Sequence, residues 1–252
     1  MAIDKNLISS LFVHADTALI HGQRLGELCG HGPVLEQDIA LTNISLDYIG
    51  RARLYYDLIS KLEGNNKTED DYAFHRIESE FKNLLLVEYP NKDFAYTVAK
   101  QFFIDVFYYH FFLQCVESKN QEIISISQKS LKETAYHKKW SSEWIIRLGD
   151  GTDISHQKMQ NAVADLWMYV GEMFVPTEFE QVVIKENLMA DLLPIKSLWE
   201  AEVKDIFSIA GIKQAENNWA QSGGKEGNHT EYMGYILSEM QYIPRTYPNM
   251  IW

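Results

Sequence analysis

Apolar residues recur at helical spacing along almost the whole chain of 252 residues, and this pattern constrains the fold most. The first such stretch, residues 4–29, places one stripe of side chains inward: Leu7, Leu11, Ala15, Ala18 and Leu25. Two-residue hairpin signals between alternating strands are absent, because the Asp150–Gly151 pair lies between two helical stretches. Long helices joined by short loops run antiparallel to their neighbours, so the pattern predicts an all-α antiparallel bundle.

Capping residues, glycines and prolines set the expected helix boundaries. The expected helices span residues 4–29, 34–62, 68–90, 93–118, 121–148, 152–174, 194–210 and 230–242. Capping-box spacing occurs twice, in Thr68 with Asp71 and in Thr177 with Glu180. The helix at 34–62 is apolar over so much of its circumference that we expect it to be central. The glycine-rich segment 221–228 is expected to be a solvated loop, and the whole chain, 1–252, a single domain because no break in composition interrupts it.

Charge and cysteine usage narrow the class of protein. The 23 basic and 35 acidic residues give a net charge of −12, which argues against a nucleic-acid-binding surface. The most apolar stretch, 102–116, is too short to span a bilayer and contains Asp105, so no membrane partner is expected. Cys29 and Cys115 have no paired spacing, and the first residues lack a secretory signal. A cytoplasmic protein is therefore expected.

Several polar residues fall where a helical core is expected. Asp105 stands in the centre of an apolar stripe, and an isolated buried carboxylate is too costly to leave unpaired. Asp47 and Arg51 lie one turn apart on the apolar side of their helix, at the spacing of an ion pair. The helix at 121–148 presents one polar face, made of Ser130, Glu133, His137, Ser141 and Trp144.

Inward carboxylates and a histidine on long helices raise the question of a di-iron centre. Such a centre needs a Glu-x-x-His pair from each of two helices and a Glu from each of two others. An acid precedes a histidine by three residues at two places, and neither fits a metal ligand pair. Asp153 and His156 lie in the first turn of a helix, where an acid is expected for capping, and Glu226 and His229 are separated by the glycine-rich loop. Glu133 and His137 are four apart instead of three.

These spacings favour a satisfied buried polar network over a metal site. Its expected members are Asp47, Arg51, Asp105, Glu133 and His137. No catalytic residue, cofactor-binding residue or metal ligand is assigned to the chain. The alternative is a di-iron or single-metal oxygenase whose unorthodox ligands come from Asp47, Asp105, Glu133 and His137.

Long motifs along the chain resemble a known family. They are GQRLGELCGH at 22–31, EQDIALTNI at 36–44, DYIGRAR at 47–53, EFKNLLLVE at 80–88, WIIRLGDGT at 144–152 and HTEYMG at 229–234. In these motifs the chain resembles the structural C subunits of bacterial phenylacetyl-CoA epoxidases. The resemblance implies a ferritin-like bundle with additional C-terminal helices and without a working di-iron centre.

The resemblance also implies partners and a role in aerobic phenylacetate catabolism. A catalytic subunit holds the di-iron centre and epoxidises the aromatic ring of phenylacetyl-CoA with dioxygen and electrons from a reductase. The chain is then expected to be a non-catalytic subunit without a cofactor, which pairs with the catalytic subunit in a hetero-oligomer with the other subunits. A further possibility is that Lys138, Lys139 and Arg147 contribute basic groups to the coenzyme A phosphates.

Overall fold

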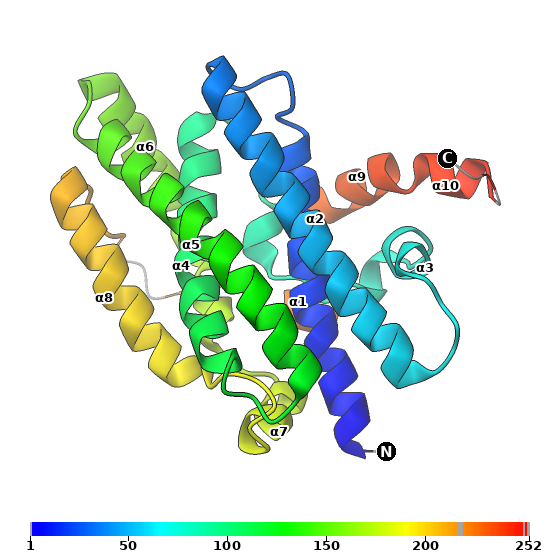
Figure 1. The fold of residues 1–252 in the computed structure, drawn as a ribbon. Helices are drawn as coiled ribbons and strands as arrows, with labels where there is room; N and C mark the ends of the chain where they lie inside the picture. The colour runs from blue at the N-terminus through cyan, green and yellow to red at the C-terminus, as the bar shows by residue number, and fades with distance from the viewer. Residues whose placement is uncertain (1, 216–218, 249, 251–252) are drawn as a thin grey trace. The chain divides into compact units, whose positions relative to one another are not determined.

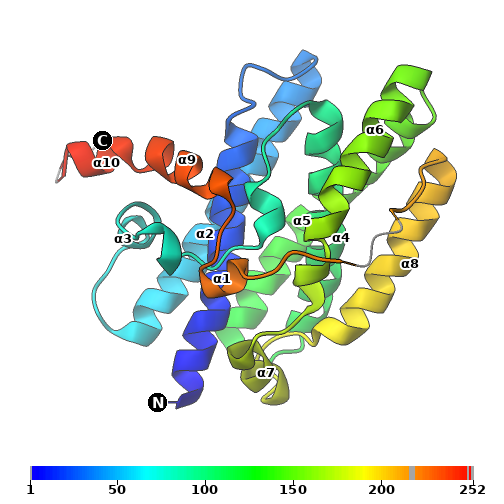
Figure 2. The same ribbon diagram turned by 180° about the vertical axis from the view of Figure 1, so that it is seen from behind.

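The computed structural model describes residues 2–215, 219–248 and 250 (Figures 1 and 2). All regular structure among these residues is helical, which confirms the all-α prediction. The chain divides into two compact units, and each is described by itself. The first unit comprises the described residues of Met1–Pro90 and Ser222–Trp252, and the second comprises Asn91–Gln221. The expectation of a single domain stays a prediction.

The first unit is built on an antiparallel pair of long helices, α1 (Ala2–Gly26) and α2 (Leu35–Glu63), which lie side by side in both views (Figures 1 and 2). The five residues expected to point inward from α1 are all buried. The expected stripe of α2 is buried as well: Leu41, Ser45, Tyr48, Ala52, Tyr55 and Ile59. The prediction that α2 is a central helix is wrong for its outer side, where Leu35, Ile39, Leu46 and Ile49 are exposed.

The single helix expected over residues 68–90 is wrong. The segment forms α3 (Glu69–Phe74), whose capping box of Thr68 and Asp71 is confirmed, and two short 3-10 turns, η1 (Glu78–Glu80) and η2 (Leu85–Glu88). The backbone N–H groups of Lys82 and Leu84 donate to the side chains of Asp16 and Thr17 on α1, at 2.8 and 3.1 Å. These distant acceptors replace the hydrogen bonds that would have continued the helix.

The C-terminal part of the first unit folds back onto this segment. It contains η5 (Gly224–Glu226), α9 (Glu231–Met240) and α10 (Tyr242–Thr246), in place of one helix over 230–242. Helix α9 contacts α1, η1 and η2. The expected solvated loop is wrong, because Lys225 is buried. A side chain at Gly224 would collide with the carbonyl oxygen of Asn83, so this glycine lets the loop pack closely.

The second unit surrounds one helix, α4 (Phe94–Cys115), in which every residue from 97 to 108 is buried. Helices α5 (Gln121–Gly149), α6 (Asp153–Leu166) and α8 (Leu192–Ala210) pack against it. The expected helix over 152–174 ends early, since α6 gives way to η3 (Trp167–Tyr169) and η4 (Gly171–Phe174). Helix α7 (Glu178–Lys185) begins at the predicted capping box.

Candidate functional site

Asp105 occupies the middle of α4 and is completely buried. Its Oδ1 accepts a hydrogen bond from Gln101 Nε2 at 2.6 Å, and its Oδ2 accepts one from Ser141 Oγ at 2.8 Å. His137 Nδ1 lies 4.0 Å from Oδ1. Gln101 precedes Asp105 by one turn of α4, and His137 precedes Ser141 by one turn of α5, so two helical repeats bring the four side chains together. We call these four residues the Asp105 cluster.

Glu133 lies one turn before His137 on α5 but reaches the edge of the core. Its side chain is 19% exposed, and Oε1 lies 3.9 Å from Lys129 Nζ at the surface. The sequence placed Asp105 and His137 in the expected network and Ser141 only on the same helix face as His137, and it did not point to Gln101. The signal that could have found Gln101 is its spacing of four residues from a carboxylate in a buried stripe.

Asp47 and Arg51 belong to the first unit. Arg51 is buried, with its guanidinium carbon 4.6 Å from the centre of the Tyr48 ring, whereas Asp47 is half-buried. Their ion pair stays a prediction. Because the other three expected members lie in the second unit, a single network of all five also stays a prediction.

Buried cations in the first unit include Arg24, Arg51 and Lys225. Burial, reinforced by the positive charges of Lys225 and Arg51, lowers the pKa of His14 to about 3, so its imidazole is neutral. Sequence reasoning missed Lys225. The glycines around it allow the loop backbone to approach the core closely, but no local pattern predicts that the lysine itself is buried.

The residues present do not fit a two-iron centre. Iron needs carboxylate and imidazole groups that converge on one point, but both oxygens of Asp105 already accept hydrogen bonds. Among the described residues, no group of three or more histidine, cysteine, aspartate or glutamate side chains converges closely enough to hold a metal. The buried cations of the first unit would repel an additional positive ion.

The basic residues considered for coenzyme A binding do not gather at one place. Lys138 Nζ donates to Glu202 Oε1 at 2.5 Å and lies 3.8 Å from the centre of the Tyr109 ring. Burial opposes the charge of Glu202, but its contacts with His110 and Lys138 lower the pKa of the carboxyl below its usual value. Lys138 is therefore neutralised by Glu202. Arg147 is exposed and pairs with Glu143 at 3.4 Å, and Lys139 is exposed.

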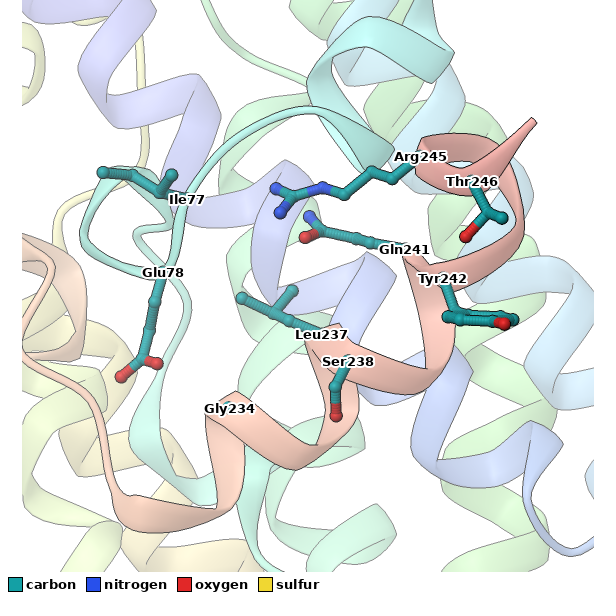
Figure 3. Close-up of a pocket in the computed structure, with 9 residues that line it drawn as sticks. All are labelled: Ile77, Glu78, Gly234, Leu237, Ser238, Gln241, Tyr242, Arg245 and Thr246. Carbon is teal, nitrogen blue, oxygen red and sulfur yellow. The ribbon is translucent and has the colours of Figure 1, made fainter. Parts of the chain in front are cut away.

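A groove of about 410 Å³ lies between η1 and the C-terminal helices of the first unit. Figure 3 shows its lining side chains, with Arg245 and Gln241 extending from the C-terminal helices across the groove. Arg245 donates to the carbonyl oxygens of Phe74 and Arg76, and Gln241 Nε2 donates to the carbonyl oxygen of Arg76 at 3.0 Å. These polar groups attach the C-terminal helices to the α3 segment, so the groove offers a structural contact and no pair of reactive groups.

The helices of the described residues include none with an apolar stretch long enough to cross a bilayer.

Comparison with known proteins gives one family and one curated relative. A family model described as "Phenylacetic acid catabolic protein" matches residues 2–252. The C subunit of the 1,2-phenylacetyl-CoA epoxidase of Escherichia coli (strain K12) is 44% identical over 242 residues. The alignment covers 94% of this chain and 95% of that protein, so the similarity extends over both units.

Proposed function

Because the chain belongs to the phenylacetic acid catabolic protein family, we propose that it is the structural C subunit of a phenylacetyl-CoA epoxidase in aerobic phenylacetate catabolism. The observation that carries this proposal is the identity of 44% to the E. coli C subunit over nearly the full length of both chains. Both oxygens of the Asp105 carboxylate already accept hydrogen bonds, so this carboxylate is not free to bind iron. This supports the view that the oxygen chemistry takes place in another chain.

In this proposal the chain is a non-catalytic partner of a catalytic subunit that holds the di-iron centre. Two irons, dioxygen and electrons from a reductase would act in that subunit, in the cytoplasm, on the aromatic ring of phenylacetyl-CoA. This chain would contribute assembly and stability, since its buried carboxylates Asp16, Glu88 and Asp105 are used in hydrogen bonds and ion pairs within their own units.

Co-expression tests the assembly role. The catalytic subunit is expected to co-purify with this chain in a fixed ratio. Epoxidation of phenylacetyl-CoA in the presence of dioxygen and reductase should fall at least about tenfold when this chain is omitted, which corresponds to about 1.4 kcal/mol. The measurements are the mass of the purified complex and the rate of product formation. If the catalytic subunit is as soluble, iron-loaded and active without this chain as with it, the proposed role is wrong.

Iron loading tests the alternative, an oxygenase with unorthodox ligands. After anaerobic incubation with ferrous iron and desalting, this chain is expected to retain far less than one iron per chain, because the carboxylate of Asp105 is occupied by Gln101 and Ser141. Elemental analysis measures the ratio. About two irons per chain, lost in His137→Ala and kept in the matched surface variant His31→Ala, would favour the alternative instead.

A further inference from the structure

One buried face of α5 carries a row of polar side chains. Its members recur alternately three and four residues apart and are completely buried: Ser127, Ser130, Thr134, His137 and Ser141. We call these five residues the α5 polar row. At one end the row joins the Asp105 cluster, because Ser141 Oγ donates to Asp105 Oδ2 at 2.8 Å. A helix face at this spacing is usually apolar when it is buried, since a buried polar group needs hydrogen-bond partners.

Two hydroxyls at the other end of the row lack such partners. The Oγ atoms of Ser127 and Ser130 have no hydrogen-bond partner among the described residues. The exposed Ser125 of the same helix, by contrast, donates to the carbonyl oxygen of Gln121 at 2.9 Å, a common arrangement for a serine within a helix. Side chains three positions apart on a helix lie about 5–6 Å from each other, so one water molecule can bridge both buried hydroxyls.

A cavity of about 370 Å³ leads from the surface to this end of the row. It lies at the C-terminal end of α4, where Leu113 and Cys115 line it together with Met189 and Ala190 from the loop between α7 and α8. Leu113 is exposed, whereas Cys115 is buried. Burial raises the pKa of the Cys115 thiol to about 12, and the Ala190 backbone and the Ser127 hydroxyl, which lie next to the sulfur, act in the opposite direction. The thiol therefore lies between the cavity and the α5 polar row.

We propose that the α5 polar row binds internal water molecules, which enter from this cavity and extend toward the Asp105 cluster. Water fits the row because it both donates to and accepts from hydroxyls, and a buried water typically makes about three hydrogen bonds to polar groups that otherwise have none. The row ends at the carboxylate of Asp105 and the imidazole of His137, so the same waters would let these two buried groups exchange protons with the solvent. The proposal concerns the second unit alone and does not depend on the epoxidase assignment.

Thermal unfolding of serine variants of the full-length chain tests whether the hydroxyls are hydrated. The Tm of Ser130→Ala is expected to lie about 2–4 °C below that of Ser125→Ala, because the bound water loses a hydrogen-bond partner. Ser125→Ala is the matched control, since it gains the same helix propensity at an exposed site of the same helix. In a dry core the change at Ser130 would remove an unsatisfied polar group and raise the Tm. A Tm of Ser130→Ala at or above that of the control would overturn the proposal.

Magnetic relaxation dispersion of water counts the internal waters of the full-length chain and measures their residence times. The double variant Ser127→Ala with Ser130→Ala is expected to lose at least one internal water, and Ser125→Ala none. Leu113→Trp, at the exposed wall of the cavity, should keep the number of waters and lengthen their residence time. Leu198→Trp, at a similarly exposed position of α8 outside the cavity, should change neither. An unchanged number of waters in the double variant would overturn the proposed site, and an unchanged residence time in Leu113→Trp would overturn entry through the cavity.

Discussion

Replacement of Asp16 by alanine is expected to lower the free energy of unfolding by about 3–5 kcal/mol, the usual cost of removing one partner from a buried ion pair. Asp16 is completely buried on α1. Its Oδ1 accepts from the Tyr56 hydroxyl at 2.6 Å and from Arg76 Nη2 at 2.5 Å. Its Oδ2 accepts from Arg76 Nη1 at 3.0 Å and from the Lys82 backbone N–H at 2.8 Å.

The cost arises mainly from the cation left behind. The Arg76 guanidinium lies 4.0 Å from the centre of the Phe81 ring and 4.8 Å from that of Phe12. Burial among these rings opposes its charge, but the adjacent Asp16 raises the pKa of Arg76 above its ordinary value. Without Asp16, the charge would remain in an apolar site without its counter-ion.

Urea unfolding followed by circular dichroism measures this loss, and hydrogen exchange resolved by peptide assigns it to the first unit. The matched control, Asp70→Ala at an exposed acid of α3, should cost less than about 1 kcal/mol. The double variant Asp16→Leu with Arg76→Met should be more stable than Asp16→Ala, because no buried charge remains. An Asp16→Ala variant within about 1 kcal/mol of the wild type would show that the pair contributes little.

The contacts of Asp16 also explain why the sequence predicted the long helices correctly but not the segment after α3. Helices α1, α2, α4 and α5 begin and end within a few residues of their predicted limits, because an amphipathic repeat over many turns is a strong local signal. At 68–90 the spacing of Phe74, Ile77 and Phe81 also looked helical, yet Ile77 is 59% exposed. The backbone N–H groups of this segment donate to side chains of α1 that are more than 60 residues away in the sequence. No local sequence pattern predicts these acceptors.

The candidate site was partly predictable for a similar reason. Asp105 was recognisable because a charge in the middle of a buried stripe must find partners, and the helical repeat placed His137 on the polar face of the neighbouring helix. Ser141 was placed on the same face but was not expected to be a partner of Asp105. Arg51 was also recognisable by its place on α2. The burial of Lys225 was not predictable, because it depends on a loop that returns from the C-terminal end of the sequence. The sequence overestimated how much of α2 is buried within the chain. An apolar pattern does not distinguish a helix face that is buried within the chain from one that is not.

Glu88 forms the other contact whose loss should have a large effect. Its side chain is completely buried on η2. Its Oε1 accepts from Asn83 Nδ2 at 2.8 Å and from His229 Nδ1 at 2.7 Å. Its Oε2 accepts from the backbone N–H and the hydroxyl of Thr230, at 2.8 and 2.6 Å. Thr230 caps the start of α9, so Glu88 attaches the C-terminal helices to the rest of the first unit.

Glu88→Ala is expected to lower the free energy of unfolding by about 3–5 kcal/mol, because it leaves buried donors and a buried histidine cation without their acceptor. Hydrogen exchange should increase most in α9 and α10. Glu239→Ala, at an exposed acid of α9, is the matched control and should change the stability by no more than about 0.5 kcal/mol. Unchanged protection of α9 in Glu88→Ala would contradict the assigned attachment.

The pH dependence of stability separates the charge interaction between Glu88 and His229 from the hydrogen bonds of Glu88. His229 Nε2 lies 3.0 Å from the carbonyl oxygen of Phe81, so both ring nitrogens face acceptors and the imidazolium form is favoured. Burial opposes this charge, but the hydrogen bond and negative charge of Glu88 outweigh it and raise the pKa of His229 above its ordinary value of 6.5. The stability from this shift is complete below about pH 6.5 and is lost as the pH rises through the folded-state pKa.

Glu88→Gln keeps the size of the side chain and removes its charge, so this part of the pH dependence should disappear. Urea unfolding of the wild type, Glu88→Gln and Glu239→Ala at a series of pH values measures the effect. The wild type and Glu239→Ala should lose stability relative to Glu88→Gln as the pH rises above about 6.5. Parallel curves for all three proteins would mean that His229 is neutral in the folded chain, and that Glu88 attaches α9 by its hydrogen bonds to Asn83 and Thr230 alone.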